Sequence, residues 1–148
     1  MAVLEIDFRQ FTFIDIGSGK GRALLLAAEF PFRRVIGIEL LAELNAVAEE
    51  NIRKFSGEKR ACGEMQAVCG DAPEFIFPTE PLVIFLFNPL PEAGLKKVVE
   101  NLEASLRENP RPVYVIYASP VFERIVAACS VLIRIAGTQQ YSLFRTPA

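Results

Sequence analysis

The 148-residue sequence contains no histidine, and this absence removes several classes of catalytic and metal site. Nucleophiles activated by a Ser–His or Cys–His pair are excluded, because the imidazole base is missing. The three cysteines form no CxxC pair, so a metal site built from nitrogen and sulfur ligands is disfavoured as well. We therefore expect no metal centre, and much hydrolytic chemistry is disfavoured.

An excess of basic residues and a long hydrophobic run are also missing. The net charge is −2 and the pI about 5.3, which argues against nucleic acid as a partner. The longest apolar run, at 82–87, has the length of a strand, whereas a membrane span needs ~20 residues. Glu5 and Asp7 stand where a signal peptide would be basic and then apolar. These features predict a soluble, cytoplasmic protein without a membrane partner.

What the sequence does contain is a regular alternation of strand and helix patterns, with 51% hydrophobic residues. The patterns predict strands at 11–16, 35–40, 64–70, 82–87 and 113–118, and helices at 20–30, 41–55 and 95–109. In helix 41–55 the apolar residues from Leu41 to Phe55, Val47 among them, form one stripe. A further helix is expected after Ser119, with Ser119 as its N-cap and Pro120 at its first position.

Two strands, at 131–137 and 140–146, end the chain. Only a few residues around Gly137 separate them, so we expect an antiparallel hairpin. Alternating strands and helices pack as an α/β sandwich around a mostly parallel sheet. Because no linker or repeat interrupts the pattern, residues 1–148 are expected to form a single domain.

The stretch "IDIGSGKGR" (14–22) places Gly17, Gly19 and Gly21 behind Asp15, at a strand-to-helix turn. Such a turn can aim backbone N–H groups at a ligand, although an ordinary tight turn uses the same residues. The dinucleotide fingerprint G-x-G-x-x-G would require a sixth-position glycine, where this chain has Arg22. The loop alone therefore leaves both interpretations open.

Polar residues also lie at the ends of the next three strands. Glu39 could accept both ribose hydroxyls of a nucleoside, or it could be an acid favoured at a helix N-terminus. Asp71 could accept a hydrogen bond from an adenine amino group. Asn88 would lie beside the glycine loop if the first and fourth strands flank the point where the winding reverses. The sequence therefore predicts a ligand site at one rim of the sheet.

With these residues in view, the chain resembles a class I S-adenosylmethionine-dependent methyltransferase over residues 11–146. The matching stretches are "DIGSGKG" (15–21), "VIGIEL" (35–40), "GDA" (70–72) and "FNPLP" (87–91), together with the closing hairpin. The resemblance implies a three-layer α/β/α sandwich with a seven-stranded sheet in the order 3-2-1-4-5-7-6, strand 7 being antiparallel. It also implies S-adenosylmethionine as the cofactor and methyl transfer as the activity.

The resemblance assigns a role to each residue of the predicted site. The methionine part would lie against Asp15, Gly17, Ser18, Gly19 and Gly21. The ribose would bind Glu39, the adenine would lie on Leu40, and its edge would be recognised by Asp71 and Ala72. Asn88 would lie nearest the transferable methyl group, which makes it the candidate catalytic residue.

Two departures from the family pattern bear on the methyl acceptor. Members that methylate planar amide or base nitrogens carry Asn/Asp-Pro-Pro-aromatic, but here Leu90 and Pro91 replace the last two residues. An amide or nucleobase acceptor is therefore not supported, and the acceptor is left as a small molecule or a protein. Tyr117 could line the acceptor site or be a packing residue.

The second departure is that only 14 residues precede Asp15. We expect a minimal core, or a gene fragment that lacks its substrate-recognition segment. A homodimer is the alternative to a missing segment. Two alternative functions stay open. One is a non-catalytic module that keeps the fold and the cofactor. The other is a nicotinamide-dependent oxidoreductase, which Arg22 and the closing hairpin disfavour.

Overall fold

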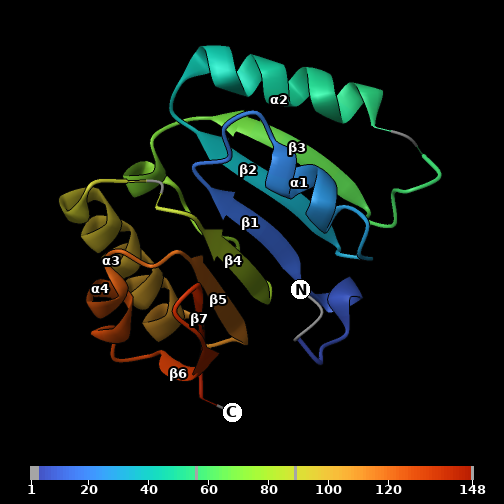
Figure 1. The fold of residues 1–148 in the computed structure, drawn as a ribbon. Helices are drawn as coiled ribbons and strands as arrows, with labels where there is room; N and C mark the ends of the chain where they lie inside the picture. The colour runs from blue at the N-terminus through green and yellow to red at the C-terminus, as the bar shows by residue number, and fades with distance from the viewer. Residues whose placement is uncertain (1–3, 56, 89, 148) are drawn as a thin grey trace.

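The computed structural model describes residues 4–55, 57–88 and 90–147, in which strands and helices alternate as expected (Figure 1). The strands are β1 (Thr12–Ile16), β2 (Arg34–Glu39), β3 (Glu64–Cys69), β4 (Leu82–Leu86), β5 (Val113–Ala118), β6 (Ile133–Gly137) and β7 (Tyr141–Arg145). The α-helices are α1 (Arg22–Ala27), α2 (Ala42–Lys54), α3 (Glu92–Glu108) and α4 (Glu123–Ala127), and the 3-10 helices are η1 (Phe8–Gln10) and η2 (Ala72–Glu74). None of the helices in these described ranges is long and apolar enough to cross a membrane.

The seven strands form one sheet in the order β3-β2-β1-β4-β5-β7-β6, which confirms the predicted topology. The first five strands pair in parallel, and β7 runs antiparallel to both of its neighbours, β5 and β6. The winding reverses between β1 and β4, which are adjacent and in register from Thr12 opposite Leu82 to Ile16 opposite Leu86. The carboxyl ends of β3, β2, β1 and β4 therefore meet at one edge.

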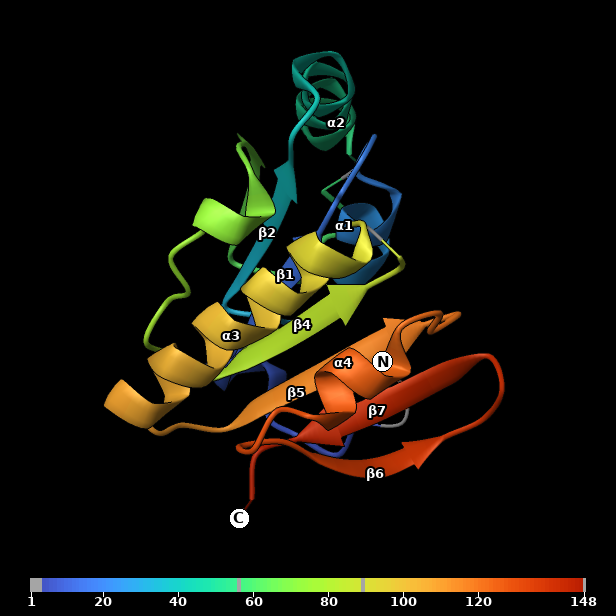
Figure 2. The same ribbon diagram turned by 90° about the vertical axis from the view of Figure 1, so that its left-hand side faces the viewer.

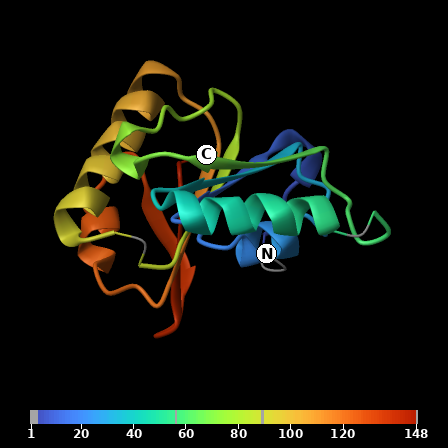
Figure 3. The ribbon, with the colours of Figure 1, turned by 90° about the horizontal axis from the view of Figure 1, so that it is seen from above.

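Helices cover both faces of the sheet, so the predicted three-layer sandwich is confirmed. Figure 2 shows α3 and α4 on one face, and in Figure 3 they lie across the sheet from α2. The core on the α3 and α4 face contains Leu95 and Leu102 of α3, together with Ile84 of β4. Leu24 of α1 and Phe13 of β1 belong to the core on the opposite face.

Some element boundaries differ from the sequence prediction. Helix α1 is shorter than 20–30 because Gly21 adopts a left-handed conformation and ends the preceding loop. Helix α3 begins three residues early, directly after Pro91. The prediction of Ser119 as N-cap is wrong: α4 begins at Glu123, and Ser119 has a φ of 47°, outside the extended region that an N-cap adopts.

The apolar stripe predicted on α2 is also wrong in part. Leu41 and Val47 are exposed, and the buried positions are Asn45 and Ala48. The helix therefore packs a narrow, partly polar side against the molecule. Asparagine is mostly exposed in folded proteins, so a buried asparagine on this helix is an informative exception.

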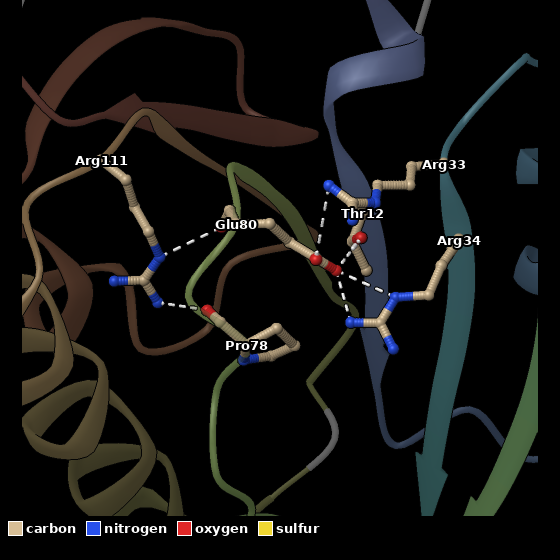
Figure 4. A network of polar contacts seen from close by, with 6 residues as sticks. All are labelled: Thr12, Arg33, Arg34, Pro78, Glu80 and Arg111. Carbon is tan, nitrogen blue, oxygen red and sulfur yellow. Dashed lines mark hydrogen bonds and ion pairs between the residues drawn. The ribbon is translucent and has the colours of Figure 1, made fainter.

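At the amino ends of the strands a cluster of polar and charged side chains links neighbouring strands (Figure 4). The Glu80 carboxylate accepts hydrogen bonds from the Thr12 hydroxyl and from Arg34, whose Nε lies 2.9 Å away, and Arg33 lies 3.8 Å away. Burial alone would raise the pKa of Glu80, but the hydrogen bonds from Thr12 and Arg34, together with the positive charges of Arg34 and Arg33, outweigh this effect and lower the pKa. The cluster thus joins β1, β2 and the start of β4.

Arg111, which lies just before β5, extends this set of contacts. Its guanidinium donates to the carbonyls of Pro78 at 2.6 Å, Glu80 at 3.1 Å and Asn109 at 2.8 Å, and to the Ser105 hydroxyl at 3.0 Å. Burial lowers the pKa of Arg111 from its ordinary value. One side chain therefore fixes the segment before β4 to the end of α3.

Candidate functional site

The structure brings the predicted site residues to the carboxyl edge of the sheet. Asp15, Glu39, Asp71 and Asn88 lie at or just beyond the ends of β1, β2, β3 and β4, four strands that are neighbours. Ligands of open α/β sheets bind outside this edge, where the winding reverses. The edge is therefore the candidate site.

The glycine loop after β1 has a backbone conformation that residues other than glycine rarely adopt. Gly17, Gly19 and Gly21 have φ values of 78°, 54° and 88°, all in the left-handed region. The N–H groups of Gly17 and Ser18 donate to the Ile38 carbonyl at 2.8 and 3.0 Å. The loop is thus held against the end of β2 by its own backbone.

Glu39 connects the end of β2 to this loop. One carboxylate oxygen accepts the Gly19 N–H at 2.9 Å, and the other accepts the Leu41 N–H at 2.8 Å. The residue is only 9% exposed. Each carboxylate oxygen can accept a second hydrogen bond, so Glu39 retains capacity for a ligand hydroxyl.

Asp15 is a second buried carboxyl group beside Glu39. It is 4% exposed, and burial raises its pKa to about 7, with a further contribution from the negative charge of Glu39. Neither carboxylate forms an ion pair with any residue that the structure describes. The site therefore brings two carboxyl groups together without an internal cation, which favours a ligand that carries positive charge.

On the β2 and β3 side the site has an apolar and a polar part. Leu40 is 61% exposed and Ala72 is buried, while the Asp71 side chain is exposed and makes no capping bond to η2. The exposed thiol of Cys69 lies 3.7 Å from the Leu40 carbonyl oxygen. A flat apolar group with polar atoms at its edge suits this arrangement.

The Asn88 side chain is held by the segment after β5. Its Nδ2 donates to the Ser119 carbonyl at 2.6 Å, and its Oδ1 accepts the Tyr117 hydroxyl at 2.9 Å. Tyr117 is fully buried, so it is a packing residue and does not line an acceptor site. Pro89 of the predicted "FNPLP" motif lies outside the described residues.

Sequence reasoning missed the role of Gly37, in the middle of β2. A Cβ at this position would lie 2.5 Å from Ser18 Oγ and 2.7 Å from Leu24 Cδ1, so only glycine lets the loop and α1 pack this closely. The Ser18 hydroxyl is buried there without a hydrogen-bond partner among the described residues. A glycine inside the strand pattern "VIGIEL" was the available signal, since such glycines mark a close approach.

The polar side of α2 was also missed. Asn51 Nδ2 donates to the Lys20 carbonyl at 2.9 Å, which fastens the helix to the glycine loop. Asn45 is 3% exposed, and its Oδ1 has no partner in the part of the chain that the structure describes. The clue in the sequence is that two asparagines interrupt the apolar spacing of helix 41–55.

No group of three or more His, Cys, Asp or Glu side chains among the described residues could hold a metal ion. The polar groups that the strand ends bring to the site are the carboxylates, the loop backbone and Asn88. The arrangement can bind and orient a ligand through hydrogen bonds and charge.

Compared as a sequence, the chain matches no family model and no curated protein. Compared as a structure, it is similar to an RNA methyltransferase from Salinibacter ruber in complex with S-adenosyl-L-homocysteine, with a TM-score of 0.56, 20% identity, and coverage of 98% of this chain and 84% of that chain. A ribosomal protein L11 methylase from Lactobacillus delbrueckii subsp. bulgaricus gives a TM-score of 0.59 at 15% identity, covering 91% and 69%.

A third similar structure, the StiE O-MT, gives a TM-score of 0.62 at 13% identity over 88% of this chain. The chain spans only about half, 49%, of that compared chain, which comprises residues 961–1257 of StiE. The three similarities define a Rossmann-like α/β fold with a reversed seventh strand. It is the fold of class I S-adenosylmethionine-dependent methyltransferases, as the sequence resemblance implied.

Proposed function

We propose that this chain is an S-adenosylmethionine-dependent methyltransferase core that transfers a methyl group to a small-molecule or protein acceptor. The observation that carries the proposal is the contact between Glu39 and the Gly19 N–H. It joins an acid at the end of β2 to a left-handed glycine loop, at the edge where the winding reverses. The fold supports the same function.

The residues present fit this cofactor. S-adenosylmethionine carries a sulfonium and an ammonium group, and the unpaired carboxylates of Asp15 and Glu39 supply opposite charge. A Cβ on Gly19 would meet nothing within 4 Å, so there is free space over the loop. Glu39 can accept ribose hydroxyls, and the exposed Leu40 and Asp71 suit an adenine face and its amino edge.

When bound, the cofactor supplies a methyl group already activated for in-line displacement. The chain then contributes orientation, which can supply roughly 7–11 kcal/mol of a barrier in well-aligned systems. Asp15 and Gly17 to Gly21 would hold the methionine part, and Glu39 would fix the ribose. No histidine is present as a base, so an amine or a thiolate acceptor is the simplest substrate.

Calorimetric titration with S-adenosylmethionine, S-adenosylhomocysteine and NAD tests the proposal. We expect the first two to bind and Glu39→Ala to weaken them by about 1.5–3 kcal/mol, the range for hydrogen bonds to a charged group. Glu43→Ala, an exposed acid in the first turn of α2, is the matched control and should leave the affinity unchanged. Tighter binding of NAD, or a folded Glu39→Ala variant with full affinity, would contradict the proposal.

Binding without turnover would identify a non-catalytic module of the same fold. A radiolabelled methyl group makes this outcome measurable against panels of amines, thiols and proteins. Transfer to any of them, lost in Glu39→Ala at limiting cofactor, would establish the enzymatic function.

A further inference from the structure

Two turns at the candidate site have an unusual backbone conformation. Asn88 and Ser119 have φ values of 44° and 47°, and they are the two described residues other than glycine in the left-handed region. They follow β4 and β5, which are neighbours in the sheet. Such conformations are unfavourable for ordinary side chains and persist where surrounding contacts impose them.

The contacts that impose this conformation form one small network around Asn88. Its Nδ2 donates to the Ser119 carbonyl at 2.6 Å, and its Oδ1 accepts from the Tyr117 hydroxyl at 2.9 Å and from the Val121 N–H at 3.3 Å. The Tyr117 hydroxyl in turn accepts the Phe122 N–H at 3.2 Å. The Asn88 amide therefore ties the end of β4 to the whole turn between β5 and α4.

The hydroxyl of Tyr117 is the internal end of this network. Tyr117 is 0% exposed, so it can touch neither the cofactor nor an acceptor. A phenylalanine would fill the same core space, and it would have no polar atom to satisfy. The role of the hydroxyl is therefore to hold Asn88 and the start of α4 through hydrogen bonds.

On the basis of the proposed function, we infer that Tyr117 is a positioning residue. Through its hydrogen bond to Asn88 it fixes the position of the Asn88 side chain, which forms the wall of the methyl-transfer site at the end of β4. Asn88 then serves the site through its place in the network, because its Oδ1 already accepts two hydrogen bonds within the protein. This differs from direct contact between the Asn88 amide and the methyl group. If the Asn88 amide contacted the methyl group directly, substitution of Asn88 would alter the site and substitution of Tyr117 would not.

The two possibilities separate in the spectrum of bound S-adenosylmethionine carrying a 13C-labelled methyl group, which requires no knowledge of the acceptor. The variants are Tyr117→Phe, Asn88→Ala and their combination. Tyr114→Phe is the matched control, because Tyr114 lies on the same strand at its opposite end, where its ring packs against Phe11. The unfolding midpoint of each variant is measured in parallel.

If Tyr117 positions the wall, Tyr117→Phe and Asn88→Ala should move the bound methyl resonance in the same direction and weaken binding about three- to tenfold. The double variant should resemble either single variant, since residues in one network are not additive. Tyr114→Phe should leave both the resonance and the affinity unchanged.

A Tyr117→Phe spectrum identical to wild type, with Asn88→Ala altered, would overturn the inference and favour direct contact. A lowered unfolding midpoint with an unchanged resonance would overturn it too, because Tyr117 would then serve stability alone. Absence of any bound resonance in the wild-type protein would instead overturn the proposed function, and this inference with it.

Discussion

At the amino ends of the strands Glu80 has two arginines and a threonine as partners, whereas at the carboxyl ends Asp15 and Glu39 lie together with no cation among the described residues. The pKa of Glu80 is lowered by its partners, and the pKa of Asp15 is raised to about 7 by burial and by Glu39. The same chemical group thus stabilises one edge and is disfavoured in its charged form at the other. The carboxylate with cationic partners stabilises the amino edge of the sheet. The carboxyl groups of Asp15 and Glu39, without cationic partners among the described residues, lie at the carboxyl edge, where a cationic ligand could pair with them.

The largest expected effect lies at the amino edge. Glu80→Ala leaves Arg34 and the buried Thr12 hydroxyl without their acceptor, so we expect a loss of about 3 kcal/mol in the free energy of unfolding, measured with urea. Glu50→Ala removes exposed ion pairs on α2 and should change stability by less than about 0.5 kcal/mol. Equal effects of the two variants would contradict the comparison.

The Glu80 effect should also depend on pH. Because the folded state lowers the pKa of this carboxyl group, its contribution is fully present above the ordinary value of 4.5 and is lost as the pH falls through the folded value. The difference between wild type and Glu80→Ala should therefore shrink in acid. A difference that grows in acid would show that the carboxylate is not stabilised by its partners.

The second effect concerns packing under the glycine loop. Gly37→Ala places a Cβ 2.5 Å from Ser18 Oγ, and overpacking of this kind should cost about 2 kcal/mol of unfolding free energy. Gly70→Ala is the control, because its Cβ meets no atom within 4 Å. Combining Gly37→Ala with Ser18→Gly should recover part of the loss, and no recovery would place the strain elsewhere.

A third, opposite effect is expected at Asp15. Its pKa is raised above the ordinary value of 3.8, so the folded state loses stability as the pH rises from about 4 to about 7, because burial disfavours the ionised form. Asp15→Asn removes this loss, so it should stabilise the protein at pH 8 and do so by less at pH 5. Denaturant unfolding at both pH values measures it, with the exposed Asp71→Asn as control.

The same substitution tests the site. If the ionised Asp15 carboxylate attracts a cationic cofactor, Asp15→Asn should bind S-adenosylmethionine more weakly while being more stable. Wild-type affinity should rise with pH up to about 7, as the carboxyl group loses its proton. A variant that gains stability and keeps full affinity would assign Asp15 to the fold alone.

The smallest effect is expected at Gly19. Its φ of 54° is unfavourable for alanine, but a Cβ there meets nothing within 4 Å, so Gly19→Ala should cost about 1 kcal/mol. Gly57→Ala, which also meets nothing, should be close to neutral. Cofactor binding should suffer more than stability, because the added methyl group enters the free space over the loop.

The fold, and the edge of the sheet at which the polar residues meet, were predictable from the sequence. The sheet order followed from residues 15–21, 35–40 and 87–91 through a family resemblance, and the hairpin from the spacing around Gly137. The polar residues at the strand ends were identifiable because parallel strands bring their carboxyl ends together. The sheet order therefore depended on the resemblance, and the meeting of these polar residues at one edge followed from the topology of a parallel sheet.

Pairwise contacts were not predictable in this way. The cluster around Glu80 joins Thr12, Arg34 and Glu80 across 68 residues of sequence, and no local pattern marks such a set. The proline after Ser119 favours a helix cap there, but the hydrogen bond from Asn88 holds Ser119 in a left-handed turn. Tertiary contacts outweighed the local preference at this turn, as they did on the polar side of α2.

The missing side chain of Gly37 has a consequence for how this protein can vary. Since Ser18 and Leu24 occupy the space that a Cβ would need, positions 18, 24 and 37 form one unit although they lie on a loop, a helix and a strand. A larger residue at 37 requires smaller ones at 18 and 24. Among natural variants these three positions should change together, and a change at 37 alone should be rare.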